Sequence, residues 1–200
     1  MPSQATDEPT GGFSHFSVVI IYKSGVYNFE ERSHLRKLYH LEYPGVNIYL
    51  IFSVGLPRTS LGNWAARFCR PHKPIFIYID DDYAVNTNKL ATFVRNLTSE
   101  LRENLNYGCE VMVSPVFRPT SPYALLWSYR HVHDLALAMH FTKPMVADDT
   151  WLGMVQYKLN LTPKRLKGMF RESSPIPKDV NCSDIFFALL SEFEQRKCAL

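Results

Sequence analysis

Three consecutive aspartates, Asp80, Asp81 and Asp82, directly follow an apolar run of β-forming residues at 75–79. Adjacent negative charges repel one another unless a cation or strong donors offset them, and strand ends in α/β sheets are where ligands collect. Because side chains alternate along an extended segment, Asp80 and Asp82 are expected to share one face. An all-oxygen group fits Mg²⁺ or Mn²⁺ better than zinc. The triplet therefore predicts a divalent metal site, and the alternative is a solvated acidic turn.

A second acidic pair, Asp148 and Asp149, follows the apolar residues 146–147. Two acidic sites allow a division of labour: one holds a cation that neutralises a phosphate leaving group, and a separate carboxylate deprotonates an attacking hydroxyl. That chemistry fits transfer of a sugar from a nucleotide diphosphate. The alternative is that the pair caps a helix beginning near Trp151, where the helix dipole stabilises negative charge. The local pattern leaves both interpretations open.

A rival enzyme class fits the same acidic residues. Haloacid-dehalogenase-like phosphatases use an apolar strand followed by Asp-x-Asp, with one Asp as nucleophile, the next as general acid, and later acidic residues holding Mg²⁺. Asp80, Asp82 and the pair at 148–149 can be arranged in that scheme. In that family, however, the strand usually opens the domain, whereas two strand units come first here. The phosphatase is therefore the second interpretation.

The elements that position these residues follow from hydrophobic periodicity and chain breakers. Strands are expected at 16–22, 46–54, 75–79 and 110–117, helices at 29–41, 61–68, 89–105, 124–141 and, capped by Ser183, at 185–193, and a basic loop at 164–178. Thr87 or Asn88 is the expected cap of the helix at 89–105. Strand, helix and strand at this spacing over 16–54 predict a parallel βαβ unit and an α/β fold.

Composition limits the classes of function. With 200 residues and 46% hydrophobic side chains the chain can bury a core, and one globular domain is expected. The formal charge is only +3, with no Lys/Arg run, so no nucleic acid is expected as partner. No stretch approaches the roughly 20 apolar residues that span a bilayer. The chain as written is therefore expected to be soluble.

Cysteines and sequons bear on the compartment. Four cysteines lack any C-x-x-C spacing, which disfavours a zinc or thioredoxin-like motif, and they could pair in about three ways. They are Cys69, Cys109, Cys182 and Cys198. N-x-[ST] sequons at Asn96, Asn160 and Asn181 would suit a lumenal or secreted protein. No signal peptide is visible in residues 1–12, so these features leave the compartment open.

Three blocks of sequence together resemble a known family. Residues 31–39, ERSHLRKLY, resemble an early Arg-x-x-[Ile/Leu]-Arg-x-Thr-Trp helix, with Leu38 and Tyr39 in place of Thr and Trp. Residues 77–86, IYIDDDYAVN, resemble a Val-Asp-Asp-Asp-Val-Phe-Val-Asn segment, and residues 148–153, DDTWLG, resemble a Glu-Asp-Val-x-x-Gly turn. In this order the blocks resemble the β-1,3-galactosyltransferase and N-acetylglucosaminyltransferase group, glycosyltransferase family 31.

The resemblance implies a GT-A, Rossmann-like nucleotide-sugar-binding fold and an inverting hexosyltransferase. Such an enzyme moves galactose or N-acetylglucosamine from a UDP-sugar, with Mn²⁺ or Mg²⁺, to a glycan acceptor on protein or lipid in β-1,3 linkage. It also implies the lumenal side of the Golgi membrane, although the chain shows no membrane anchor.

Carried over by position, the resemblance also implies residue roles. Asp82 is the expected direct metal ligand, and Asp80 and Asp81 are expected to help with the metal or the nucleotide ribose. Asp149 is the expected catalytic base on the acceptor hydroxyl. Arg32 and Arg36 are expected to anchor the helix or the diphosphate.

The resemblance covers residues 16 to about 166 and departs from the family twice. Between 57 and 61 the family has a longer stretch with an acidic strand, and near 129–130 it has a Tyr-Pro and Gly-rich segment. Losing a strand and a pocket wall should leave polar backbone unpaired, so the GT-A fold is expected to be incomplete, and a non-catalytic remnant is the alternative to an active enzyme. The expected organisation is a polar tail at 1–15, the transferase domain at 16–166, and a loop with an amphipathic helix at 167–200.

Overall fold

A six-stranded mixed β-sheet forms the centre of the computed structural model, which describes residues 16–55, 58–110, 120–145, 148–171 and 176–200. In sheet order the strands are β2 (Glu42–Tyr43), β3 (Val46–Val54), β1 (Phe16–Ser24), β4 (Ile75–Asp80), β7 (Thr120–Trp127) and β6 (Asn106–Glu110). The central strand β1 pairs in parallel with both β3 and β4, and β7 is antiparallel to β4. The predicted parallel βαβ unit is therefore confirmed.

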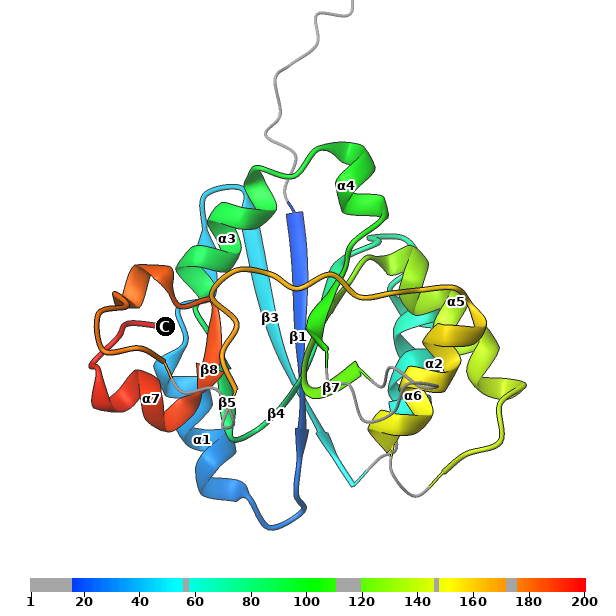
Figure 1. Ribbon diagram of the computed structural model, residues 1–200, viewed down its shortest axis with the longest axis horizontal. Coiled ribbons are helices and arrows are strands. Elements are labelled where there is room, and N and C mark those ends of the chain that lie inside the picture. The colour runs from blue at the N-terminus through cyan, green and yellow to red at the C-terminus, as the bar shows by residue number, and fades with distance from the viewer. Residues whose placement is uncertain (1–15, 56–57, 111–119, 146–147, 172–175) are drawn as a thin grey trace, which may run out of the picture.

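Helices cover both faces of this sheet (Figure 1). They are α1 (Phe29–Leu38), α2 (Arg58–Phe68), α3 (Thr87–Arg95), α4 (Ser99–Glu103), α5 (Tyr129–His140), α6 (Asp148–Lys158) and α7 (Leu190–Gln195). Helices α1, α3 and α7 lie on one side, and α2, α5 and α6 on the other. Strand alternation divides the core accordingly: Ile20 and Ile77 pack in one cluster, Ile21 and Tyr78 in the other. The predicted α/β fold class is confirmed.

A small second sheet continues directly from the acidic turn. Its strands are β5 (Tyr83–Val85) and β8 (Phe187–Leu189), which pair antiparallel. The backbone N–H of Leu190 donates to the carbonyl of Asp82 at 2.8 Å, so the C-terminal segment supports the turn. A disulfide joins Cys182 and Cys198, 16 residues apart. A loop of this length is stabilised by roughly 3 kcal/mol.

Two predicted helices have different boundaries in the structure. The helix expected at 89–105 is divided into α3 and α4, because Asn96 ends the first and the Thr98 hydroxyl caps the second. The cap of α3 is Asn86, whose side chain accepts from the N–H of Lys89, so the expected cap at Thr87 or Asn88 was wrong by one or two positions. The helix expected from residue 124 begins only at Tyr129, because Ser128 caps it.

The amphipathic helix expected after Ser183 was also wrong. A 3₁₀ turn, Cys182–Asp184, is followed by strand β8, and α7 starts only at Leu190. The run at 185–190 repeats apolar residues at a spacing that fits a helix, but pairing with β5 fixes it as a strand. The strand expected at 110–117 lies mostly outside the described residues; β6 itself covers Asn106–Glu110.

No helix in the described part of the chain is long and apolar enough to cross a membrane.

Candidate functional site

The acidic turn lies where two parallel strands end side by side. Strand β4 ends at Asp80 and β1 ends at Ser24, and in the register Lys23 stands opposite Asp80. Asp81 and Asp82 form a turn, so the extended segment from which Asp80 and Asp82 were expected to share one face ends at Asp80. The extended strand thus includes only the first of the three aspartates. Asp82 is exposed, and the other two aspartates are half-buried.

Asp81 is the aspartate that the surrounding loop holds in place. Its Oδ2 accepts from the hydroxyl of Ser24 at 2.6 Å and from the side-chain amide of Asn28 at 2.8 Å. The guanidinium of Arg32 donates to the same Ser24 oxygen at 2.9 Å and to the carbonyls of Gly25 and Val26. Adjacent carboxylates were expected to need either a cation or strong hydrogen-bond donors, and the hydroxyl of Ser24 and the amide of Asn28 are such donors. The β1–α1 loop is thereby fixed to the acidic turn.

Arg32 and Arg36 both make anchoring contacts. Arg32 is only 6% exposed, so its donors serve the β1–α1 loop. The guanidinium of Arg36 lies 4.4 Å from the centre of the Phe52 ring on β3, which fastens α1 to the sheet. Anchoring is one of the two roles expected for these arginines. Contact of either with a diphosphate stays a prediction.

Residues after β1 extend the site beyond what the sequence predicted. Gly25 allows the Asn28 side chain to lie close to the backbone, because a Cβ at position 25 would lie 3.0 Å from Oδ1 of Asn28. Next to Asn28, Tyr27 is 89% exposed and Phe29 is 65% exposed, so both rings are accessible beside this loop. A signal for this loop was available: Ser24 ends a strand parallel to the one that carries the aspartates, and such ends meet at one edge.

Behind the turn lies a buried pair of tyrosines. The hydroxyls of Tyr22 and Tyr39 hydrogen-bond to each other, and the Tyr39 hydroxyl accepts from the N–H of Val85 at 2.9 Å. The Tyr22 hydroxyl also donates to the carbonyl of Tyr83 at 3.3 Å. Burial raises the pKa of Tyr39 to about 12 and that of Tyr22 well above its ordinary value. The pair joins β1, the end of α1 and β5 beneath the aspartates.

This pair predicts a loss of stability in alkaline solution. The folded pKa of Tyr39 lies above its unfolded value of about 10, so its contribution is fully present below pH 10 and is lost as pH rises towards 12. A pKa raised this far corresponds to roughly 3 kcal/mol of folding free energy. In urea unfolding at pH 9 to 11.5, Tyr39→Phe should show a shallower fall of the unfolding free energy than wild type. The exposed Tyr157→Phe is the control, and equal slopes in Tyr39→Phe and wild type would contradict the assignment.

Asp148 and Asp149 stand at the start of a helix. Helix α6 begins at Asp148, so both acids lie in its first turn, where negative charge is stabilised. The helix thus begins three residues before the expected start near Trp151, and the two aspartates lie inside its first turn rather than at its cap. The side chains of these two residues fall outside the described part of the chain. The role of Asp149 as catalytic base therefore stays a prediction.

The described residues contain no group of three or more His, Cys, Asp or Glu side chains that could hold a metal ion. The triplet is therefore not a closed, all-protein metal cage. Mg²⁺-type ions, however, are usually bound by one or two carboxylates together with substrate phosphates and water. Asp80 and Asp82 offer oxygen ligands of that kind at the carboxyl end of β4. The donor set fits a cation shared with a diphosphate.

Comparisons with known proteins bear on the fold. No protein-family model matches the chain, and no curated protein matches it. Among solved structures, it is similar to a glycosyltransferase involved in the glycosylation of the major capsid of PBCV-1, with a TM-score of 0.52 and 13% identity. The alignment covers 90% of this chain and 98% of that chain. The chain thus has the Rossmann-like α/β fold of a glycosyltransferase, and at this identity the likeness concerns the fold alone.

Proposed function

We propose that the protein is a glycosyltransferase that takes a sugar from a nucleotide diphosphate donor at the acidic turn. The observation that carries the proposal is the position of Asp80 to Asp82 at the joined carboxyl ends of β1 and β4, in a fold shared with a glycosyltransferase. In open α/β sheets this edge is where nucleotides bind. Asp81 is fixed by Ser24 and Asn28, so the turn is pre-organised before a ligand arrives.

The chemistry assigns a separate task to each acidic site. Asp80 and Asp82 would hold Mn²⁺ or Mg²⁺, which when bound offsets the charge on the departing diphosphate. Asp149 would remove the proton from the acceptor hydroxyl as it attacks the anomeric carbon. Asp81 would keep Asn28 and the exposed Tyr27 beside the donor. Attack from the face opposite the leaving group would invert the anomeric carbon.

The finer assignment rests on the sequence resemblance to glycosyltransferase family 31. On that resemblance we propose a UDP-sugar donor, transfer of galactose or N-acetylglucosamine, and a β-1,3 linkage to a glycan on protein or lipid. A lumenal Golgi location is proposed with it. The Cys182–Cys198 disulfide supports that location, because such bonds persist in oxidising compartments.

The first experiment is a thermal melt with and without UDP plus Mn²⁺, followed by transfer assays with UDP-galactose and UDP-N-acetylglucosamine. Ligand at 100 times Kd should raise Tm by about 5 to 10 °C. Turnover that is lost in Asp149→Ala would support the enzyme. A shift without turnover would instead identify a non-catalytic nucleotide-binding remnant. No shift would overturn the donor site, and release of phosphate from phosphomonoesters would favour the phosphatase.

Tyr27 offers a test of where the nucleotide base lies. An exposed aromatic ring next to Asn28 can stack on a planar base, an interaction worth roughly 1–3 kcal/mol. Tyr27→Ala should therefore weaken UDP binding about tenfold in titration calorimetry and leave Tm unchanged. Phe141→Ala, which removes a ring that is 80% exposed at the end of α5, is the matched control. Equal affinity in Tyr27→Ala and wild type would place the base elsewhere.

A further inference from the structure

A large cavity lies at the opposite edge of the sheet from the acidic turn. It has a volume of about 710 Å³ and is lined by Phe16 and Ser17 at the start of β1 and by Ile75 at the start of β4. The aspartates follow the other end of the same strands. A strand of nine residues spans about 26 Å, so the cavity and the proposed donor site are separate. Cavities of this volume usually take small molecules.

The cavity gathers positive charge from three parts of the chain. Arg70 and Lys73 come from the loop before β4, Arg102 from α4 and Arg130 from α5, and Glu103 is the carboxylate among the lining residues. The whole chain has 22 Lys and Arg residues and 19 Asp and Glu residues. Without the four basic residues and the one acidic residue of the cavity, the rest of the chain has equal numbers of basic and acidic side chains. The formal charge of +3 on these five cavity residues therefore equals the formal charge of the whole chain.

These four cations have no carboxylate partner among the described residues. The guanidinium of Arg102 lies 3.8 Å from the centre of the Phe16 ring, and its Nε is buried with no hydrogen-bond partner among the described residues. Burial also lowers the pKa of Arg102. The guanidinium of Arg102 also donates to the carbonyl of Leu97 at 3.4 Å, and a guanidinium that has no carboxylate partner can form charge-assisted hydrogen bonds with an oxyanion.

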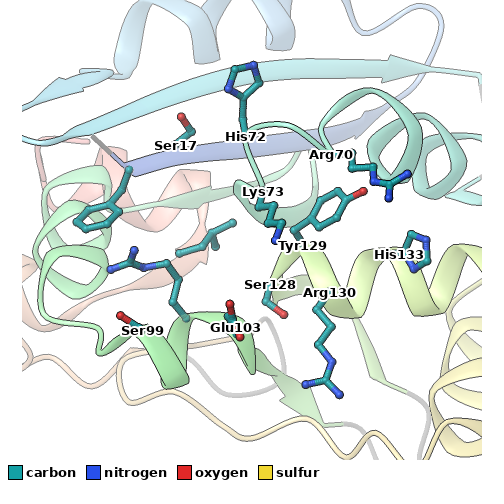
Figure 2. Close-up of a pocket in the computed structure, with 13 residues that line it drawn as sticks. Ser17, Arg70, His72, Lys73, Ser99, Glu103, Ser128, Tyr129, Arg130 and His133 are labelled. Carbon is teal, nitrogen blue, oxygen red and sulfur yellow. The ribbon is translucent and has the colours of Figure 1, made fainter. Parts of the chain in front are cut away.

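The loop before β4 is shaped to present its two cations. The N–H of Lys73 donates to the carbonyl of Cys69 at 2.9 Å, and Lys73 has a φ of 41°, which few residues other than glycine adopt. Figure 2 shows the Lys73 side chain pointing toward Ser128, with the Tyr129 ring next to it and the Arg70 side chain on the far side of that ring. The hydroxyl of Tyr129 donates to the carbonyl of Ala66 at 2.6 Å, so its ring is fixed as part of the wall. Apolar surface from Phe16, Ile75 and Tyr129 thus lies among the cations.

We propose that this cavity binds a small organic polyanion that carries at least two phosphate or sulfate groups. Guanidinium groups bind such oxyanions through paired hydrogen bonds, and the apolar wall would contact the body of the molecule. The cations come from three elements, the loop before β4, α4 and α5, so a molecule with more than one anionic group could contact more than one of these elements. The site does not depend on the proposed donor site.

The test is titration calorimetry with sucrose octasulfate and, separately, inorganic pyrophosphate, with sucrose as the uncharged control. Arg70→Gln/Lys73→Gln should weaken binding about tenfold or more, because two charge-assisted contacts are lost. Lys143→Gln/Lys178→Gln removes two exposed charges elsewhere and should change affinity less than twofold. Tighter binding of sucrose octasulfate than of pyrophosphate is expected, because only the larger molecule presents an organic body together with several anionic groups.

A second variant keeps this test independent of glycosyl transfer. Asp82→Asn should leave the affinity for sucrose octasulfate unchanged even though it weakens UDP plus Mn²⁺. Unchanged Tm values for both double variants would show that the fold is intact. Equal weakening in the two double variants would mean diffuse charge attraction, and failure of wild type to bind either probe would mean that no such site exists. Either result overturns the proposal.

Discussion

Asp82→Asn is expected to weaken the binding of UDP plus Mn²⁺ at least 100-fold while leaving the fold intact. The amide keeps the size of the carboxylate but removes its charge, and a bound cation loses one of two proposed protein ligands. A 100-fold change corresponds to about 2.7 kcal/mol. Asp80→Asn should act in the same direction. Titration calorimetry of UDP with and without Mn²⁺ measures the effect, since binding of UDP without the metal should change little.

Stability provides an independent check on this site. Removing one of three adjacent negative charges relieves repulsion, so Asp82→Asn should not lower Tm in the absence of ligand. Asp179→Asn, an exposed aspartate beyond the acidic turn, is the matched control and should bind UDP plus Mn²⁺ normally. If Asp82→Asn binds as wild type does, the metal ligands lie elsewhere. If both variants weaken binding alike, only the overall charge matters.

The second large effect is on stability: Gly168→Ala should lower the free energy of unfolding by about 3–5 kcal/mol. Gly168 has a φ of +87°, and a Cβ there would lie 2.2 Å from the carbonyl oxygen of Asp184 and 3.1 Å from the backbone nitrogen of Phe186. Both contacts are with backbone, which cannot move cheaply. The carbonyl of Gly168 also accepts from the N–H groups of Phe186 and Phe187.

A second glycine separates the two causes of that loss. Gly45 has a φ of +74°, but a Cβ there would meet nothing within 4 Å. Gly45→Ala should therefore cost only the left-handed backbone conformation, about 1–2 kcal/mol, in urea unfolding. The difference between the variants measures the clash. Because β8 pairs with β5 and the N–H of Leu190 donates to the carbonyl of Asp82, Gly168→Ala should also weaken UDP binding. Equal losses of unfolding free energy in the two glycine variants would contradict the structure.

The parallel strands could be predicted because each is an uninterrupted apolar run between breakers. Strands β1, β3 and β4 and helix α1 lie close to their expected ranges, since local pattern and burial agree there. Strand β8 could not be found in this way. Its residues are spaced as in a helix, and only pairing with β5, about 100 residues earlier, makes them extended.

The same limit applies to the site. The strand-end position of the aspartates followed from the apolar run before them. Their partners did not, because Ser24 and Asn28 are 57 and 53 residues away from Asp81 and meet it only through the sheet. The burial of Arg32 was equally invisible, since a helix with exposed charges on most sides gives no sign of which one turns inward.

The disulfide between Cys182 and Cys198 has a practical meaning for work on this protein. Both residues flank the segment that contains β8 and α7, which supports the acidic turn. Protein produced in a bacterial cytosol, where thiols are kept reduced, would lack this disulfide. Such preparations should melt earlier than oxidised ones and recover on gentle air oxidation. The host and the redox buffer therefore belong among the variables of every binding measurement described above.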